Sequence, residues 1–521
     1  MPIRRRIGLA YLPGALPCFE DFGNLPTDLV CKDGLVDGKP ASDVLDMMII
    51  PGGSLVESQS VNPVVSREIL KMAESGKFLL GICSGFQVFA SRTDVGRLST
   101  VPIVREGLGL IDAEVQPLVC TDQINAQIVD KSFISDVVGG EVSGFHCHTY
   151  GKVTLQGNNA KEVLVSHIQH ANYRRAPQDL VSGVANREGN VVGVFVHALL
   201  DQNPIIVEGI MKALDVNQLE LQEIRKVNAK LVSDIKGEIG INTNVRPAVV
   251  AKKTPVMVLV TALGSGSGKT FLVTGMAGAL KKRGYNVGLI KLGGDIRDSV
   301  PALYLVKEPI KSYSSIKISE SGWTPVKEAI EQACGVHDFL FVEGAMSAFT
   351  GLLNSKITRP ASTLEVAASL GVSIVVVVTC DKEGIEGGLV NVLNYVNMLK
   401  MLGVNPTGVI LNKMSTSYLT EEDNQVIKQA LENVGVQLIG VVPSMKIEKR
   451  GMIPEIEICY EEFGMQAIDA AERYINLEQL VKLAKTPNQN MIDYVAFVEK
   501  FKKLLINYPG SIPKRAEADC L

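Results

Sequence analysis

Short apolar runs, separated by stretches of helical periodicity, recur along most of the chain. In the first half such runs cover residues 7–12, 47–51, 78–81 and 191–196. In the second half they cover residues 254–261, 286–290, 339–342, 372–379, 408–411 and 437–442. Continuous apolar runs of this length are typical of strands that are buried on both faces of a sheet. The pattern therefore predicts an α/β protein with parallel sheets covered by helices.

A change of pattern near the middle divides the chain. Residues 218–253 are charged and helical at first and irregular afterwards, and the alternation of strands and helices then resumes. We therefore predict a first domain at 1–217, a linker at 218–253, a second domain at 254–475 and a helical C-terminal tail at 476–521. The 521 residues are enough for two domains with sizeable cores.

Composition narrows the classes of partner. The formal net charge of −4 gives no electrostatic reason to expect nucleic-acid binding. The longest apolar run, 372–379, is far shorter than the roughly 20 residues that span a bilayer. The 9 cysteines include no Cys-x-x-Cys pair, which favours a reducing compartment. We therefore expect a cytoplasmic protein that binds neither nucleic acid nor membrane.

Cys83 lies in Gly81-Ile82-Cys83-Ser84-Gly85, between an apolar run and a helical stretch. A cysteine on such a tight turn is held exposed between small neighbours, as a nucleophile requires. The turn also directs the backbone N–H of Ser84 toward an oxyanion formed at that point. A buried structural cysteine is the alternative, and the flanking glycines favour the nucleophile.

A nucleophilic cysteine needs a base, because the thiolate is the attacking species. His197 ends the run 191–196, so it shares the carboxyl edge of the predicted sheet with Cys83. Gly53 follows the run 47–51 in a glycine turn whose N–H groups suit an oxyanion hole. We predict Cys83 and His197 as catalytic residues, with Gly53 and Ser84 as oxyanion donors.

His146 and His148 alternate along a predicted strand and therefore face the same way. Two histidines without a third ligand make a weak metal site. A structural or substrate-side role is the better interpretation.

The second half opens with a phosphate-binding pattern. The segment Gly264-Ser265-Gly266-Ser267-Gly268-Lys269-Thr270 follows an apolar run and precedes a helical stretch, although Leu263 stands where the strict motif has glycine. Backbone N–H groups and the helix N-terminus then surround the phosphates, with Lys269 on the outer phosphates and Thr270 on Mg²⁺. The predicted ATP-binding residues of this loop are Gly264, Gly266, Gly268, Lys269 and Thr270.

Polar residues that follow other strands of this half suit the same site. Glu343 ends the run 339–342, where an acid that binds magnesium or orients water belongs, and a simple strand-capping glutamate is the alternative. Asn412 follows the run 408–411 and suits an amide contact with adenine.

Charged residues cluster after the run 286–290. We predict Asp295 as a metal ligand together with Thr270 and Glu343, and Lys291 and Asp298 as acceptor-binding residues. Lys291 and Arg297 add positive charge suited to an anionic acceptor. A local solvated charge cluster is the alternative.

Residues 3–214 resemble the class I glutamine amidotransferase domain of cobyric acid synthases, a flavodoxin-like fold. The resemblance is carried by segments 11–22, 51–53, 81–87, 106–110, 144–148 and 194–200. It implies L-glutamine as the nitrogen donor. Ordinary class I members have a glutamate two residues after the histidine, where this chain has Leu199. The cobyric acid group also lacks this glutamate, so its absence supports the resemblance to that group. Asp201 is a weak candidate for orienting His197.

Residues 254–445 resemble the dethiobiotin synthetase-like P-loop ATPases, including the synthetase domains of cobyrinic acid a,c-diamide synthase and cobyric acid synthase. Lys291, Asp295 and Asp298 align with the family segment K-x-G-P-D-Y-I-D, and 343–346 resembles the start of E-G-V-M-G. In those synthetases the ATPase domain normally comes first, so the order here is reversed.

Both resemblances imply an ATP- and Mg²⁺-dependent amidoligase that transfers nitrogen from glutamine to a polycarboxylate, a corrinoid or a related tetrapyrrole, through an acyl phosphate. One alternative is a regulatory or partitioning-type P-loop ATPase with a glutaminase-like sensor domain. Another is a binding protein with both sites decayed, against which the retained Cys83, His197, Lys269, Thr270 and Glu343 argue. The oligomeric state is left open, with a homodimer as one candidate.

Overall fold

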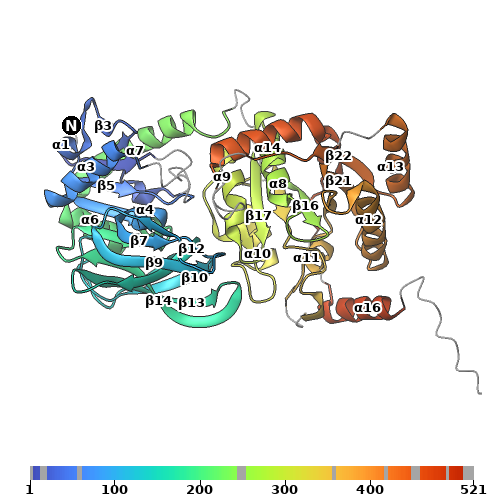
Figure 1. The fold of residues 1–521 in the computed structure, drawn as a ribbon, viewed down its shortest axis with the longest axis horizontal. Helices are drawn as coiled ribbons and strands as arrows, with labels where there is room; N and C mark the ends of the chain where they lie inside the picture. Colours follow the sequence, from blue (N-terminus) through green and yellow to red (C-terminus); the bar gives the residue numbers. More distant parts are fainter. Residues whose placement is uncertain are drawn as a thin grey trace, which may run out of the picture.

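Two α/β units lie side by side along the long axis of the molecule (Figure 1). The computed structural model describes residues 4–11, 20–54, 61–242, 254–354, 359–415, 420–447, 458–488 and 492–507. The first unit runs from blue to green in Figure 1, and the second from yellow-green to red.

The parallel part of the first unit's main sheet has the order β15-β6-β5-β1-β2. Its strands are β1 (Ile7–Ala10), β2 (Asp28–Val30), β5 (Met47–Ile50), β6 (Phe78–Ile82) and β15 (Val191–Val194). Four of these were predicted as apolar runs, and these four are buried along almost their whole length. The prediction of parallel strands is confirmed for this part of the sheet.

Most of the remaining strand pairs of the first unit are antiparallel, which corrects the prediction of parallel sheets throughout. The same sheet continues through β14 (Arg174–Asn186), β13 (Ala160–Ala171), β10 (Gln123–Ile128) and β11 (Glu141–Phe145). A second sheet contains β7 (Ala90–Asp94), β8 (Val104–Glu106), β9 (Ile111–Cys120) and β12 (His148–Leu155), and a small ribbon contains β3 (Leu35–Val36) and β4 (Lys39–Pro40). Only two residues, Asn172 and Tyr173 with φ of 50° and 65°, connect β13 to β14. A connection this short forces the antiparallel pairing.

Short helices surround these sheets in the first unit. They are η1 (Phe22–Asn24), α1 (Ala41–Val44), α3 (Pro63–Glu74), α4 (Ser84–Phe89), α5 (Leu199–Gln202) and α6 (Pro204–Ala213), followed by the longer α7 (Gln218–Glu238). A capping box of Asn217 and Glu220 starts α7. Asn228 of this helix donates to the carbonyl of Pro26 at 2.8 Å, so the charged segment predicted as a linker begins as a helix packed on the first unit. Residues 243–253, also predicted as linker, lie outside the described residues.

The second unit has a parallel sheet of order β18-β17-β19-β16-β20-β21-β22. Its strands are β16 (Val256–Ala262), β17 (Val287–Leu292), β18 (Ser315–Ile316), β19 (Phe339–Glu343), β20 (Ser373–Thr379), β21 (Pro406–Met414) and β22 (Gln437–Pro443). All the runs predicted as strands in this half are confirmed to within a few residues. The phosphate-loop strand β16 lies between β19 and β20, at the centre of the sheet.

Helices cover both faces of this sheet. They are α8 (Lys269–Lys282), α9 (Val300–Val306), α10 (Val326–Ala333), α11 (Thr363–Leu370), α12 (Gly384–Met401), α13 (Glu421–Asn433), α14 (Tyr460–Tyr474), α15 (Leu477–Leu483) and α16 (Tyr494–Ile506), with the short turns η2 (Ile296–Ser299), η3 (Ser312–Ser314) and η4 (Leu352–Asn354). Helices α15 and α16 fall in the predicted tail, whose residues 489–491 and 508–521 lie outside the described ones. Within the described parts of the chain, no helix combines the length and apolarity needed to cross a membrane.

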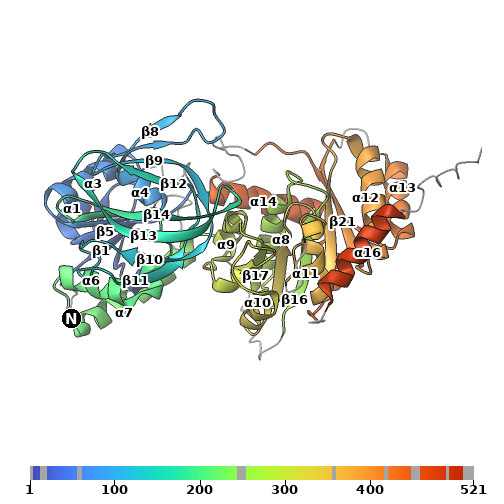
Figure 2. The ribbon, with the colours of Figure 1, turned by 90° about the horizontal axis from the view of Figure 1, so that it is seen from below.

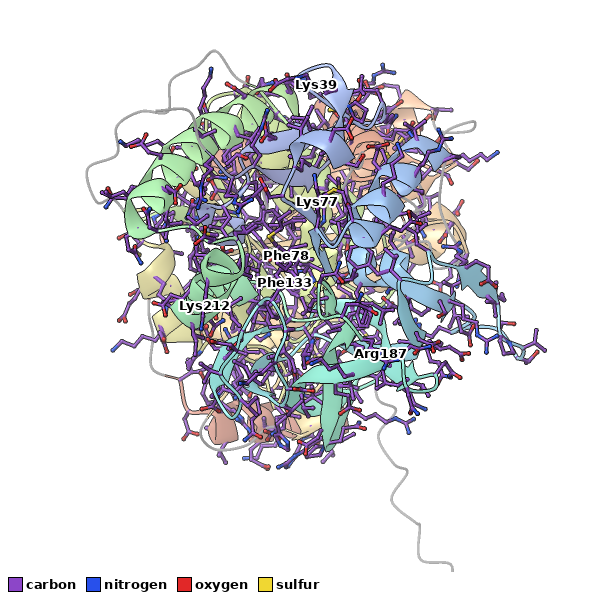
Figure 3. All side chains as sticks on the ribbon, turned by 90° about the vertical axis from the view of Figure 1, so that its left-hand side faces the viewer. Lys39, Lys77, Phe78, Phe133, Arg187 and Lys212 are labelled. Atoms are coloured by element: carbon purple, nitrogen blue, oxygen red, sulfur yellow. The ribbon has the colours of Figure 1, made fainter. Side chains whose placement is uncertain are left out.

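The sheet edge that carries Cys83 in the first unit faces the second unit. Figure 3 looks onto the opposite, outer end, where Phe78 at the start of β6 stacks on Phe133 with ring centroids 4.9 Å apart. Cys83 follows the other end of the same strand. Seen from below, α9 and α14 are the helices of the second unit nearest to the first (Figure 2).

Candidate active site

The turn that carries Cys83 is strained in the way a nucleophile elbow requires. Cys83 has φ 53° and ψ −109°, a region that residues with side chains rarely adopt. A Cβ on Gly81 would lie 2.5 Å from the carbonyl oxygen of Gly85, and one on Gly85 would lie 2.2 Å from that of Ile50. Gly81 is therefore required for the elbow to fold this tightly on itself, and Gly85 for it to pass this close to β5.

Cys83 and His197 meet beside the glycine turn that follows β5. A Cβ on Gly52 would lie 2.9 Å from Cε1 of His197 and 3.3 Å from Cβ of Cys83. The two side chains thus flank one point, with Gly53 next along the chain. The thiol of Cys83 also contacts the carbonyl oxygen of Cys147, at 3.8 Å.

Glu20 is the acid that orients His197, and the sequence did not reveal it. One carboxylate oxygen of Glu20 pairs with Nδ1 of His197, and the other accepts from the N–H of Ala198 at 3.1 Å. Both side chains are almost fully buried. The ion pair fixes the imidazole so that Nε2 is the nitrogen left for the reaction.

Asp201, the weak candidate for orienting His197, contacts the backbone that follows Glu20 instead of the histidine. Its carboxylate accepts from the N–H groups of Asp21 at 3.0 Å and Gly23 at 2.7 Å, and so holds the turn that follows Glu20. Burial, assisted by the charge of Glu20, raises the pKa of Asp201 to about 6.

The charge on His197 follows from its surroundings. Burial alone would lower the pKa of the imidazole, but the Glu20 carboxylate and the neighbouring Cys83 raise it to about 10. The ring of Phe145 stacks on it, with centroids 5.3 Å apart. His197 is therefore an imidazolium at neutral pH, which makes it a counter-ion for a thiolate and a proton donor to a leaving amine.

A cavity of about 220 Å³ opens beside the elbow. Its lining includes Ser84 and Gln87 of α4 together with Arg105 and Glu106. The guanidinium and the carboxylate carry the charges opposite to those of the α-carboxylate and α-ammonium of a free amino acid. In the sequence, residues 106–110 are recognisable only as part of a family resemblance, because a single Arg-Glu pair carries no pattern of its own.

His146 and His148 are both buried, with ring centroids 4.8 Å apart. Nδ1 of His146 lies 3.1 Å from the carbonyl oxygen of Phe195, and Nδ1 of His148 lies 3.0 Å from that of Leu118. Burial lowers the pKa of His146 to about 4 and lowers that of His148 as well, so both rings are neutral. Across the described residues, no group of three His, Cys, Asp or Glu side chains forms a metal site.

The phosphate loop of the second unit has the backbone that its glycines predict. Gly266 and Gly268 have φ of 72° and 85°, and α8 begins at Lys269. Nζ of Lys269 donates to the carbonyl oxygen of Met346 at 2.9 Å, and burial lowers the pKa of this amine. The hydroxyl of Thr270 donates to Oε1 of Glu343 at 3.0 Å, so these two metal-ligand candidates are in direct contact.

Two residues of β21 donate hydrogen bonds to the backbone of the phosphate loop. Nδ2 of Asn412 donates to the carbonyl oxygen of Ser267 at 2.8 Å, and Nζ of Lys413 donates to that of Gly266 at 2.7 Å. The amide group predicted to contact adenine thus also braces the loop. Its contact with a base remains a prediction.

Lys291 lies between two acids at the same edge. Its ammonium contacts Oδ2 of Asp298 at 2.5 Å and Oε1 of Glu343 at 3.0 Å. Burial opposes the charge of Lys291, yet these acids hold its pKa above the ordinary value. Burial also raises the pKa of Asp298, to about 6. The two predicted acceptor-binding residues are therefore joined to the predicted metal ligand Glu343.

Asp295 has a different partner from the other two metal-ligand candidates. Arg297 donates to both of its oxygens, from Nε at 2.7 Å and from Nη2 at 2.8 Å. Arg297 is only 6% exposed. Its charge is therefore engaged with Asp295, contrary to the expectation that it faces an anionic acceptor.

The two halves of the site touch directly. Trp323 of the second unit donates from Nε1 to the carbonyl oxygen of Thr121 at 2.8 Å, and its ring lies 5.1 Å from that of Phe145. Ser54, next to the predicted oxyanion donor Gly53, donates to the carbonyl oxygen of Ile458 at 2.7 Å. The sheet edge that carries Cys83 and His197 thus forms part of the interface.

Comparison with family models identifies both regions. Residues 9–205 match the CobB/CobQ-like glutamine amidotransferase domain, and residues 258–452 match the CobQ/CobB/MinD/ParA nucleotide binding domain. These matches confirm the predicted fold class, a glutamine amidotransferase-like domain followed by a P-loop domain, in the order predicted from the sequence.

Named relatives fall in one group of enzymes. The chain is 28% identical over 243 residues to a cobyrinate a,c-diamide synthase of Streptococcus sanguinis (45% of this chain, 51% of the relative), and 30% identical over 238 residues to a hydrogenobyrinate a,c-diamide synthase of Mycobacterium bovis (44% and 50%). It is 26% identical over 197 residues to a cobyric acid synthase of Dehalococcoides mccartyi (36% and 36%). The matches thus span about half the length of the two diamide synthases and about a third of the cobyric acid synthase.

Proposed function

We propose that the protein is an ATP-dependent, glutamine-hydrolysing amidoligase that converts carboxylates of a corrinoid, or of a related tetrapyrrole, into amides. One observation carries the proposal. In the first unit, three side chains lie together as a cysteine, a histidine and a buried acid: Cys83, His197 and Glu20. The second unit, which contacts the first, has a phosphate loop hydrogen-bonded to an acid at the end of a strand. A nitrogen source and a carboxylate-activating site side by side are what this chemistry needs.

The first unit would release ammonia. The Cys83 thiolate attacks the amide carbon of glutamine, and the N–H groups of Gly53 and Ser84 stabilise the resulting oxyanion. The imidazolium of His197 donates its proton to the leaving nitrogen, so ammonia departs and a thioester remains. Water, deprotonated by the now neutral His197, attacks the thioester, and the Cys83 thiolate leaves, so glutamate is released and the thiolate–imidazolium pair is restored.

Glutamine would bind in the cavity beside the elbow. Arg105 would receive the α-carboxylate of the substrate, and Glu106 its α-ammonium group. Ser84 follows Cys83 directly and Gln87 lies one helical turn further along α4, so their place on the cavity wall brings the side-chain amide of a bound glutamine toward the thiol.

The second unit would activate the acceptor. A carboxylate oxygen of the acceptor attacks the γ-phosphorus of ATP, ADP leaves, and an acyl phosphate forms. Ammonia then attacks the acyl carbon, and inorganic phosphate leaves with the former carboxylate oxygen. Because acyl phosphates hydrolyse readily, the direct contact between the units favours a shielded transfer of ammonia.

The residues present fit a magnesium ion bound with the nucleotide. The Thr270 hydroxyl and the Glu343 carboxylate are hard oxygen donors, and they lie 3.0 Å apart at the end of the phosphate loop. When bound, Mg²⁺ neutralises charge on the β- and γ-phosphates. Lys269 holds the outer phosphates, and Asp295 is a further candidate ligand on the same edge.

The acceptor is assigned from the relatives. The synthases that the chain resembles are named for cobyrinate, hydrogenobyrinate and cobyric acid. In this chain Lys291 and Asp298 lie beside the metal-ligand candidates, where an acceptor carboxylate and its phosphorylated form would sit.

Cys83→Ser tests the division of labour. This variant should lose amide synthesis from glutamine but retain synthesis from free ammonia at raised pH, because the thiol serves only to release ammonia. Products are followed by mass spectrometry with Mg-ATP and cobyrinate, since each amidation lowers the mass by about one unit when a hydroxyl becomes an amino group. A Cys83→Ser protein that still hydrolyses glutamine would contradict the assignment of the nucleophile.

A further inference from the structure

Arg297 joins the synthetase unit to the glutaminase unit through all three of its nitrogens. Nε and Nη2 contact Asp295, as described above. Nη1 donates to Oγ1 of Thr149 at 2.6 Å, and Nη2 also donates to the hydroxyl of Tyr173 at 2.7 Å. The guanidinium carbon lies 5.7 Å from the centre of the Tyr173 ring. One almost fully buried side chain of the second unit is thus held by two residues of the first.

The segment that Arg297 grips continues directly to the glutaminase centre. Thr149 is two residues from Cys147, whose carbonyl oxygen contacts the thiol of Cys83. Four residues before Thr149, Phe145 exchanges two backbone hydrogen bonds with His197, at 2.9 and 3.3 Å, and stacks on its ring. Both catalytic side chains therefore rest on residues 145–149.

On the other side, Arg297 lies within the synthetase's charged cluster. Asp298 follows it in the turn η2, and Asp295 lies just before that turn. Asp298 is connected through Lys291 to Glu343, which accepts from Thr270. This continuous set of ion pairs and hydrogen bonds begins at the phosphate loop and leads to the turn that carries Arg297. A packed network of this kind can transmit a change of occupancy between two sites.

From these contacts we propose that Arg297 is a positioning residue that makes glutamine hydrolysis depend on occupancy of the synthetase site. The proposal rests on the proposed function and adds the connection between its two reactions. Acceptor and nucleotide phosphates bring negative charge to Lys269 and Lys291, and Lys291 now neutralises Asp298. As Lys291 turns toward these anions, Asp298 and Asp295 compete for Arg297. The hydrogen bond from Arg297 to Thr149 then changes, and so does the position of residues 145–149, which contact Cys83 and His197.

The direction of the effect follows from the chemistry. Glutamine hydrolysed without an activated acceptor yields only free ammonia. A coupled enzyme therefore hydrolyses glutamine faster when Mg-ATP and acceptor are bound, and we expect a stimulation of about fivefold or more.

Thr149→Val tests the link with little disturbance of the fold, because valine has nearly the shape of threonine and removes only the acceptor for Nη1. Glutamine hydrolysis is measured in the full chain with and without Mg-ATP and cobyrinate. We expect the stimulation in Thr149→Val to fall to less than about half of the native value, with the unstimulated rate within about twofold. More glutamate should then be released per amide formed.

Thr149→Ser is the matched control, since it keeps the hydroxyl and should restore the native stimulation. Synthesis from free ammonia should be the same in all three proteins, because it does not use the link. That arm also separates the two proposals: no amide from ammonia contradicts the proposed function or its acceptor, whereas normal synthesis with unaltered stimulation in Thr149→Val contradicts only the role of Arg297.

Two further results would overturn the inference. One is a native protein whose glutamine hydrolysis does not respond to Mg-ATP and cobyrinate while ammonia-dependent synthesis proceeds. The other is a Thr149→Ser protein as uncoupled as Thr149→Val, because a loss common to both reports packing rather than the hydrogen bond to Arg297. Tyr173→Phe, which removes the other hydroxyl on the guanidinium, should weaken the stimulation in the same direction.

Discussion

Glu20 reaches His197 from 177 residues earlier in the chain, in the segment 11–22, whose family resemblance does not single out this acid. In Glu20→Gln the imidazole loses the carboxylate that outweighs its burial. We expect kcat for glutamine hydrolysis to fall about 10²-fold or more. The pKa of His197, about 10 with Glu20 present, should also fall. The alkaline limb of the pH profile of kcat/KM should therefore move to lower pH.

The same substitution has a signed effect on stability. A raised histidine pKa contributes stability that is fully present below the ordinary value of 6.5 and is lost as pH rises through about 10. Glu20→Gln should thus be less stable than the native protein near pH 6, and the difference should shrink toward pH 10 in denaturant titrations. Asp21→Asn, the same change on the exposed neighbour, should leave both profiles in place. An unmoved alkaline limb in Glu20→Gln would show that Glu20 does not set the charge of His197.

Residues with local patterns were predictable from the sequence, and those defined by distant contacts were not. Cys83, Lys269 and Thr270 stand beside glycines whose spacing predicts a tight turn, so a local pattern was enough to identify them. Glu20 and the pair Arg105–Glu106 act through residues far along the chain, so only the folded structure brings them forward. Arg297 was noticed for its charge, but its partners across the interface were beyond any sequence pattern.

Among the elements, buried parallel strands were predicted well and exposed antiparallel ones were missed. The parallel strands are continuous apolar runs, which leave a strong signal. Strands such as β10 (Gln123–Ile128) bury only alternate residues, so their runs of apolar residues are broken. The long β13–β14 hairpin depends on a two-residue connection at Asn172 and Tyr173 rather than on an Asn-Gly or Asp-Gly pair, the strongest hairpin signal.

Lys269 begins the helix α8 that follows the phosphate loop. Lys269→Ala should abolish amide formation with either glutamine or ammonia, because no acyl phosphate forms unless the γ-phosphate is held. Nucleotide affinity should fall as well, while glutamine hydrolysis without ATP should survive at least in part. Rates of amide, glutamate and ADP formation, with a nucleotide-binding titration, check each statement.

Lys282→Ala, at the far end of the same helix, is the control. Its ammonium forms a half-exposed ion pair with Glu472, and such a pair contributes about 1 kcal/mol or less. This variant should behave as the native protein does. Unchanged nucleotide affinity and amidation in Lys269→Ala would remove the loop from the mechanism.

In the whole molecule, the glutamine amidotransferase-like unit precedes the P-loop unit, and the two units contact each other directly. The order followed from the sequence, because each unit carries its own pattern. How the units face one another did not, since the interface is made by scattered residues such as Trp323, Phe145 and Ser54. Their contacts bring the glutaminase edge against the unit that would consume the ammonia.

The central claim, that the nitrogen of glutamine replaces a carboxylate oxygen by way of an acyl phosphate, is tested most directly by oxygen transfer. Cobyrinate labelled with ¹⁸O in its carboxylates is incubated with the full chain, glutamine and Mg-ATP, and both products are analysed by mass spectrometry. The account predicts one ¹⁸O atom in inorganic phosphate for each amide formed, because phosphate leaves with the oxygen that attacked ATP. Amide formed with unlabelled phosphate would contradict the acyl phosphate, and consumption of glutamine and ATP with no amide would contradict the corrinoid acceptor.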